Sequence, residues 1–168
     1  MVAQEVKTLL ILRHAKSSWD DGSLPDHDRP LNRRGERDAP RMGRYLVENA
    51  LVPDLVLSST ARRARQTALS VMEECGWRGE LRLVRSLYLA EPADYANAVQ
   101  GAPPACERVL LVGHNPGLES LIEGLTGESL TMPTAALAVL ELAAGAWSDL
   151  SLDGRTKIAS NCRPKDLD

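Results

Sequence analysis

The sequence predicts an α/β fold in which a largely parallel sheet is covered by helices on both faces. Short apolar segments without polar alternation are typical of strands buried on both sides, and three of them occupy residues 7–12, 54–58 and 108–113. Helix-like segments alternate with these strands, as in consecutive strand–helix–strand units. A chain of 168 residues is long enough for one such domain.

In order, the first predicted elements are a strand over 7–12, a polar loop over 15–31, a helix over 32–49, a strand over 54–58 and a helix over 61–75. Asn32 can cap the first helix, because its side-chain oxygen accepts a hydrogen bond from a first-turn N–H. Pro40 removes one backbone hydrogen bond, so this helix is expected either to kink or to restart near Asp38 with Pro40 in its first turn. Gly76 ends the second helix.

The remaining elements are a strand over 81–84, a helix over 94–100, a strand over 108–113, a helix over 117–125 and strands over 136–142 and 156–160. Gly101, Pro103 and Pro104 end the helix that precedes the most hydrophobic strand, and Asp153-Gly154 bounds the last strand. No internal repeat or linker interrupts this order, so residues 1–168 are expected to form a single domain.

The composition argues against several classes of protein. A formal net charge of −3 argues against binding to nucleic acid or to anionic membranes, and no apolar stretch resembles a membrane span or a signal peptide. Cys75, Cys106 and Cys162 are odd in number and widely spaced, which is typical of reduced thiols in the cytoplasm. We therefore expect a cytoplasmic protein without nucleic-acid or membrane partners. The sequence sets no oligomeric state, and a monomer is compatible with it.

Two histidines stand at the ends of predicted strands. His14 follows the strand at 7–12 directly after Arg13, and His114 follows the strand at 108–113. The carboxyl ends of parallel strands meet at one edge of an α/β sheet, and ligand sites form there. We therefore expect the two imidazoles to face one crevice.

An arginine-rich segment begins the helix after the strand at 54–58. Positive side chains in a first turn oppose the helix dipole unless an anion lies there, and the unpaired N–H groups of that turn also favour an anion. A guanidinium can donate two hydrogen bonds to phosphoryl oxygens. Arg13 and Arg63 are therefore the expected clamps for a phosphoryl group.

These residue types suit phosphoryl transfer. Hydrolysis requires an in-line nucleophile, positive charge around the phosphoryl oxygens and often an acid for the leaving group. A neutral imidazole can be the nucleophile when a backbone or carboxylate acceptor holds its other ring N–H, and attack then gives a phosphohistidine that water cleaves. A structural role for each histidine and a solvated role for the arginines are the alternatives at this point.

Three motifs resemble the histidine phosphatase superfamily, also called phosphoglycerate mutase-like. Leu12-Arg13-His14-Ala15 is similar to its first signature, Arg-His-Gly, with Ala15 in place of glycine. Residues 57–68 are similar to its second motif, in which Arg63 stands four positions after a serine, and residues 112–117 are similar to its third. The resemblance extends from about residue 8 to residue 142.

The resemblance implies a three-layer α/β/α fold with a six-stranded, mostly parallel sheet, and catalysis without a metal or cofactor. It implies that His14 is the phosphorylated nucleophile. It also implies that Arg13 and Arg63 bind the phosphoryl group of the substrate and that His114 is a further donor to its oxygens.

The short chain looks most like the small SixA-type phosphohistidine phosphatases of this superfamily. Larger members insert a lid that supplies a carboxylic acid, whereas only about two dozen residues separate the strands at 81–84 and 108–113, too few for a lid. Glu91 is the nearest candidate for the acid, and a solvated glutamate at a helix start is its alternative. An open pocket without a well-placed acid favours a phosphoramidate, which is cleaved more easily than an alcohol ester once its nitrogen is protonated.

The predicted function is therefore metal-independent hydrolysis of a phosphorylated substrate, a phosphohistidine protein, through a covalent phosphohistidine intermediate. The alternatives are a phosphatase for a small metabolite and a non-catalytic domain that binds phosphate or phosphoprotein, which Ala15 would favour if its methyl group crowds the nucleophile. Asp26-His27-Asp28 resembles a hard-metal cluster, but adjacent loop side chains rarely converge, so we expect a solvated turn and no metal site. Trp19 is expected either to line the pocket or to anchor its loop.

Overall fold

The computed structural model describes residues 6–77, 79–142 and 145–168, which form six strands and four α-helices. The strands are β1 (Thr8–Arg13), β2 (Leu55–Ser59), β3 (Glu80–Val84), β4 (Arg108–Gly113), β5 (Leu137–Glu141) and β6 (Lys157–Cys162). The helices are α1 (Arg33–Glu48), α2 (Arg62–Glu74), α3 (Pro92–Gln100) and α4 (Gly117–Thr126). Short 3-10 turns lie at η1 (Asp26–Asp28), η2 (Arg85–Leu87), η3 (Trp147–Asp149) and η4 (Pro164–Leu167).

The strands form one mixed sheet in the order β3-β2-β4-β1-β5-β6. β3, β2, β4 and β1 run parallel to one another, and β5 runs antiparallel to both β1 and β6. The six-stranded, mostly parallel sheet is therefore confirmed. The four parallel strands all end at the same edge, and the loops that leave this edge build the site.

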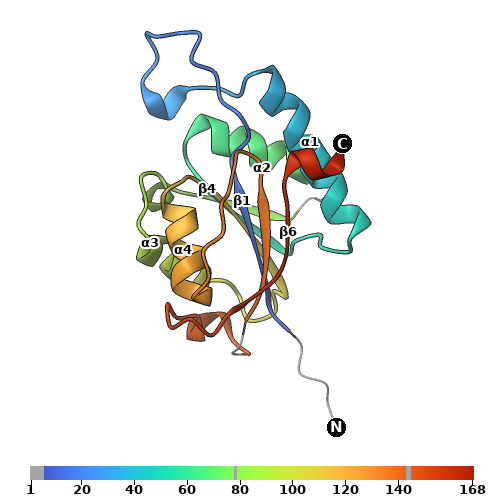
Figure 1. Cartoon of the computed structure of the whole chain (residues 1–168), viewed down its shortest axis with the longest axis vertical. Helices are drawn as coiled ribbons and strands as arrows, with labels where there is room; N and C mark the ends of the chain where they lie inside the picture. The colour runs from blue at the N-terminus through green and yellow to red at the C-terminus, as the bar shows by residue number, and fades with distance from the viewer. Residues whose placement is uncertain (1–5, 78, 143–144) are drawn as a thin grey trace.

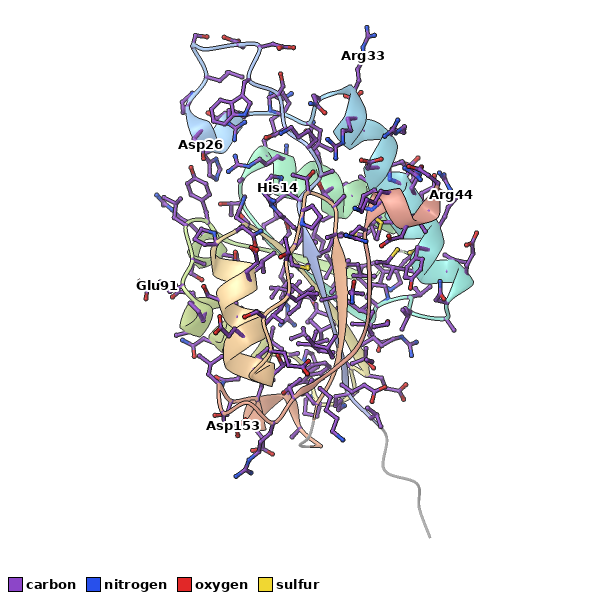
Figure 2. All side chains as sticks on the ribbon, viewed as in Figure 1. His14, Asp26, Arg33, Arg44, Glu91 and Asp153 are labelled. Carbon is purple, nitrogen blue, oxygen red and sulfur yellow. The ribbon has the colours of Figure 1, made fainter. Side chains whose placement is uncertain are left out.

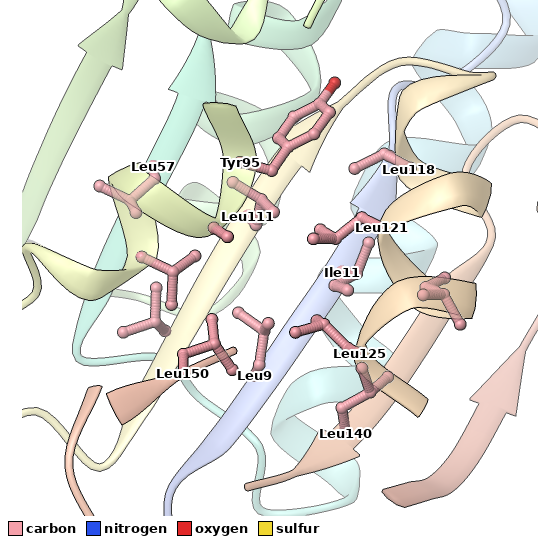
Figure 3. Packing of buried hydrophobic residues seen from close by; sticks show 14 of the residues in the cluster. Leu9, Ile11, Leu57, Tyr95, Leu111, Leu118, Leu121, Leu125, Leu140 and Leu150 are labelled. Carbon is pink, nitrogen blue, oxygen red and sulfur yellow. The ribbon is translucent and has the colours of Figure 1, made fainter. Parts of the chain in front are cut away.

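Alternate residues of the central strand β1 pack on opposite faces of the sheet, because successive side chains of a strand point in opposite directions. Leu9 and Ile11 belong to the apolar cluster that includes α3 and α4, whereas Leu10 and Leu12 belong to the cluster that includes α1 and α2. Figure 3 shows the first cluster, with α4 lying against β1. Figure 1 shows α3 and α4 on one side of the sheet and α1 on the other, so the predicted three layers are confirmed.

Helix α1 runs without a break through Pro40, so the predicted restart near Asp38 is wrong. Its first turn is capped as expected, since the side chain of Asn32 accepts a hydrogen bond from the N–H of Gly35 at 2.9 Å. Pro40 removes only one bond of the helix, whereas burial of Met42 and Leu46 stabilises it by about 1.5–3 kcal/mol for each side chain. Packing of the apolar face therefore outweighs the lost hydrogen bond.

Two other elements differ from the prediction at their ends. Helix α3 begins at Pro92 rather than at Asp94, because Pro92 suits a first helical position and the Asp94 carboxylate accepts from the N–H of Glu91 at 2.9 Å. Strand β6 extends to Cys162 because it keeps pairing with β5 up to Leu137. Among the described residues, no helix combines the length and the apolar character needed to cross a membrane.

Candidate functional site

The common edge of the parallel strands brings the two predicted histidines together. β1 and β4 are parallel neighbours in which Arg13 pairs with Gly113, and a histidine follows each of these residues. The centroids of the His14 and His114 rings lie 5.0 Å apart, and both residues are buried. Figure 2 shows His14 above the end of β1. The prediction that both imidazoles meet at one place is therefore confirmed.

The hydrogen bond of His14 fixes which of its ring nitrogens carries the proton. Nδ1 lies 2.7 Å from the backbone carbonyl oxygen of Ala15. Since a carbonyl can only accept, Nδ1 must be the donor, and the neutral ring then has a free electron pair on Nε2. Burial is the largest cause that lowers the pKa of His14 to about 4, with further contributions from the charges of Arg63 and Arg13. The ring is therefore neutral at physiological pH.

His114 is held through its backbone and through its ring. Its backbone N–H donates to the hydroxyl of Tyr95 at 3.0 Å, and its Nε2 lies 2.8 Å from the hydroxyl oxygen of Ser59 at the end of β2. Burial, followed by the neighbouring His14 and Arg63, lowers its pKa to about 3. The ring is thus neutral, and its Nδ1 is buried without a partner among the described residues.

Both predicted arginines reach the same edge. Arg13 is the last residue of β1 and donates from Nη1 to the carbonyl oxygen of Met132 at 3.1 Å. Arg63 lies in the first turn of α2, and only 6% of its surface is exposed. The sequence alternative of a solvated arginine therefore does not apply to Arg63.

The site presents buried donors that have no partner among the described residues. The Nε atoms of Arg13 and Arg63 and the Nδ1 atom of His114 are all in this state. Leaving a buried donor unpaired costs about 1–3 kcal/mol. A small tetrahedral anion bound between these side chains would accept hydrogen bonds from the guanidiniums, and from His114 in the tautomer with the proton on Nδ1. The arrangement therefore suits a phosphoryl group.

Thr67 links the segment after His14 to the start of α2, and the sequence analysis did not single it out. Its hydroxyl accepts a hydrogen bond from the N–H of Ala15 at 3.0 Å and donates to the carbonyl of Arg63 at 2.7 Å. Ala15 is fully buried in the apolar cluster of α1 and α2. Its methyl group therefore packs into the core, which removes the argument that it crowds His14.

Asp26 of η1 contacts Arg63, and the sequence analysis did not predict this contact. Its carbonyl oxygen accepts from Arg63 Nη1 at 2.7 Å, and its carboxylate accepts from Nη2 at 3.1 Å. The hydroxyl of Tyr88 donates to the same carboxylate oxygen at 2.6 Å, and Arg29 Nε donates to the other at 3.2 Å. The hydrogen bond from Tyr88 and the charge of Arg63 lower the pKa of Asp26 to about 2. Asp26 is therefore an anion at neutral pH.

The neighbours of Asp26 do not converge with it on one point. His27 lies 2.9 Å through Nε2 from the hydroxyl of Thr60 and 3.3 Å through Nδ1 from the carboxylate of Asp28. In the part of the chain that the structure describes, no group of three or more His, Cys, Asp or Glu side chains could hold a metal ion. The only sequence signal for Asp26 was its place in this apparent metal cluster.

Trp19 contacts its own loop. The Arg29 guanidinium lies over the Trp19 ring at 3.5 Å from its centroid, and the ring side chain is otherwise largely exposed. Arg29 also donates to the hydroxyl of Ser17 at 2.9 Å. Of the two expectations for Trp19, this contact supports the anchor of the loop.

Glu91 is not brought together with the four predicted site residues. It is exposed at the N-terminal end of α3, where it caps the helix and its backbone N–H donates to the Asp94 carboxylate at 2.9 Å. Figure 2 shows Glu91 at the outer border of the molecule, apart from His14. This position agrees with the alternative of a solvated glutamate at a helix start.

Comparisons with known proteins agree with this fold. The model of the histidine phosphatase superfamily (branch 1) matches residues 9–88. An uncharacterized protein of Mycobacterium tuberculosis is 37% identical over 150 residues, which are 83% of this chain and 91% of that protein.

Two solved structures cover nearly the whole chain. The candidate phosphohistidine phosphatase SixA of Nakamurella multipartitia has a TM-score of 0.84 and 27% identity over 95% of this chain and 96% of its own. The corresponding candidate from Agrobacterium tumefaciens has a TM-score of 0.80 and 30% identity over 94% and 98%. With its motifs at one sheet edge and its fold matched over its length, the chain belongs to the histidine phosphatase superfamily.

Proposed function

We propose that the chain is a phosphatase that removes the phosphoryl group from a phosphohistidine protein through a covalent intermediate on His14. One observation carries this proposal: the carbonyl of Ala15 holds the Nδ1 proton of His14, so the free electron pair lies on Nε2. His114 lies beside the His14 ring, and the charges of Arg13 and Arg63 act on that ring. Each of these three residues has a buried polar atom without a partner among the described residues. A nucleophile and a cationic cradle are the two parts that phosphoryl transfer needs.

In the first step, Nε2 of His14 attacks phosphorus while the bond from phosphorus to the substrate nitrogen breaks. The electron pair of that bond goes to the departing imidazole, which is protonated before or during departure. The guanidiniums of Arg13 and Arg63 donate to the equatorial oxygens, where negative charge is spread in the transition state. The product imidazole leaves, and the phosphoryl group stays on His14.

In the second step, a water molecule attacks the phosphorylated His14. A new oxygen–phosphorus bond forms, the nitrogen–phosphorus bond breaks, and Nε2 recovers its electron pair. The proton of the water passes to solvent or to the product phosphate. The hydrogen bond from Nδ1 to Ala15 holds the ring in the same tautomer before and after the cycle.

The proposed substrate class follows from the leaving group. Among the described residues, no hydrogen bond or ion pair joins Glu91 to His14, Arg13, Arg63 or His114, so we assign it no acid role. An imidazole is easily protonated from water, whereas an alkoxide leaving group needs a placed acid. The names of the two solved structures, both candidate phosphohistidine phosphatases, support the same class.

Trapping the intermediate tests the proposal. The protein is mixed with a substrate whose phosphoryl group is labelled and is then quenched with denaturant. We expect a label on the wild-type protein that acid removes and base does not, as for a phosphoimidazole, and no label on the fully folded His14→Ala variant. Turnover by His14→Ala at the wild-type rate would refute the nucleophile.

Two alternatives have their own readouts. A phosphatase for a small metabolite would cleave one member of a panel of sugar phosphates faster than a phosphohistidine protein, and we expect the opposite order. A binding domain without catalysis would retain phosphate affinity but show neither label nor product release. The neutral and correctly oriented His14 argues against this second alternative.

A further inference from the structure

We infer that Asp26 is a positioning residue that holds the guanidinium of Arg63 with one edge turned toward the phosphoryl group. The inference rests on the proposed function, because it assigns Asp26 a task in that site. It concerns the loop over 15–31, to which the sequence analysis assigned no catalytic residue.

The contacts of Asp26 occupy one side of the Arg63 guanidinium. A guanidinium has five N–H bonds in a fixed plane. The carbonyl of Asp26 takes one from Nη1, and its carboxylate takes one from Nη2, so both terminal nitrogens are held from the same residue. The Nε–H is buried and has no partner among the described residues. The edge that includes Nε therefore stays available for phosphoryl oxygens.

The carboxylate of Asp26 is itself fixed by two further donors. Tyr88, just after η2, donates to it at 2.6 Å, and Arg29, just after η1, donates to it at 3.2 Å. These donors come from different segments of the chain, so the carboxylate has little freedom to rotate. An exposed ion pair alone typically contributes less than about 1 kcal/mol. The network instead fixes the orientation of the carboxylate, and through it the position of the Arg63 guanidinium.

Asp26 has two opposing effects on an anion in the site. Its negative charge repels the anion, whereas its contacts with Arg63 orient the donors that the transition state needs. Its removal takes away both the orientation of Arg63 and a repulsion toward phosphate. We therefore expect affinity for a ground-state anion to change little, and affinity for a transition-state mimic to fall, because only the latter depends on exact placement of donors.

The test compares Asp26→Ala with Asp20→Ala, a matched control on the same loop. Asp20 is exposed, and its carboxylate makes no hydrogen bond or ion pair among the described residues. The probes are inorganic phosphate and vanadate, which adopts the five-coordinate geometry of phosphoryl transfer, and binding is measured by calorimetry. Asp26→Ala should lower vanadate affinity and kcat about 10- to 100-fold, with phosphate affinity within about threefold of the control.

A double-mutant cycle tests whether the effect passes through Arg63. In an Arg63→Ala background, Asp26→Ala should change vanadate affinity by less than about twofold, because the group that it positions is already absent. The same loss in both backgrounds would overturn the inference. So would equal vanadate affinities for Asp26→Ala and Asp20→Ala.

Two further measurements separate a failure of this inference from a folding defect and from a failure of the proposed function. If Asp26→Ala unfolds, Asp26→Asn replaces it, since the amide oxygen can still accept from Nη2 and should restore most of the vanadate affinity; a full loss in the folded Asn variant contradicts the inference. If the wild-type protein turns over no phosphoramidate, the proposed function fails. The two anion affinities still decide the role of Asp26 in that case.

Discussion

Arg63 has two neighbours of the same type on α2 that differ from it only in where they lie. Arg62 and Arg65 are exposed, whereas Arg63 is buried beside both histidines. Position on the helix, rather than residue type, thus decides which arginine is buried at the edge of the sheet, because a shift of one residue turns a side chain by about 100° around the axis.

Replacing Arg63 tests this selection. Arg63→Ala should lower kcat about 100- to 1,000-fold, the usual loss when one donor to transition-state charge is removed. Arg62→Ala is the matched control and should stay within about twofold of the wild type. Steady-state kinetics on a phosphohistidine protein measure both. A loss below tenfold for Arg63→Ala, with a larger loss for Arg62→Ala, would show that the wrong arginine was chosen.

The candidate site residues predicted from the sequence are those whose residue type and motif indicate their chemistry. His14, Arg13, Arg63 and His114 each stand at a strand end or helix start that could be recognised before any coordinates. Asp26 could not be assigned in this way, because its role depends on a contact with a helix 37 positions later along the chain. From residue type alone, Asp26 resembled part of a metal cluster, and we expected a solvated turn there.

At the level of elements, the junction of β4 with α3 sets the position of His114. A side chain at Gly113, the last residue of β4, would place its Cβ 2.6 Å from the Tyr95 hydroxyl and 2.7 Å from its ring. The same hydroxyl accepts the N–H of His114. Glycine at this position therefore lets α3 approach the strand closely enough to hold the histidine.

Gly113→Ala should displace either Tyr95 or the end of β4. We expect a loss of about 1–3 kcal/mol in the free energy of unfolding, typical of an overpacked core, together with lower kcat. Gly101→Ala is the control, because the nearest atom to its Cβ would be 3.5 Å away. Urea unfolding and kinetics measure the two effects. Equal stability and equal kcat for the two variants would contradict this account.

The elements themselves were predictable because their signals are local. The apolar runs of β1 and β4, the Asn32 cap and the glycine after α2 each act within a few residues. The restart expected near Asp38 was wrong for the opposite reason. The helix tolerates Pro40 because Met42 and Leu46 pack against the sheet. This packing is a tertiary contact, which the sequence near the proline does not show.

Over the whole molecule, the two buried histidines couple folding to pH. The pKa of His14 is about 4 and that of His114 about 3 in the folded state, against an ordinary value of 6.5. Between these values the unfolded chain binds more protons than the folded chain. The free energy of unfolding is therefore unaffected by these groups above about pH 6.5 and falls as the pH drops toward 4.

The expected fall from pH 7 to pH 5 is about 2 kcal/mol for each histidine. Urea unfolding at pH 8, 7, 6 and 5 measures it in the wild type and in His14→Ala, and the variant should lose about half of the slope. Identical slopes for both proteins, or a wild-type stability that is the same at pH 5 and pH 7, would show that His14 is not held neutral.

The molecule as proposed needs no bound metal for turnover. Dialysis against a strong chelator should leave kcat within about 20% of its starting value, because the charge at phosphorus comes from guanidiniums rather than from a divalent ion. The measurement compares dialysed protein with and without added Mg²⁺, Mn²⁺ or Zn²⁺. Loss of turnover that an added metal restores would contradict this prediction and would make the Asp26-His27-Asp28 turn a candidate metal site.

Architecture was the most predictable level, since alternation of strands and helices leaves few other ways to bury both faces of a sheet. The antiparallel β5 is the part that local sequence did not reveal. Its direction is set by its partners β1 and β6, and an apolar run carries no sign of the direction in which it will pair.

The hydroxyl of Thr67 joins the backbone of the segment after His14 to the first turn of α2. Thr67 accepts from the residue after His14 and donates to the carbonyl of Arg63. These two hydrogen bonds fix the segment after His14 relative to the first turn of α2, so that neither segment can shift without moving the other. An arriving phosphoryl group would therefore meet a nearly rigid receptor, with little reorganisation left for the moment of bond exchange.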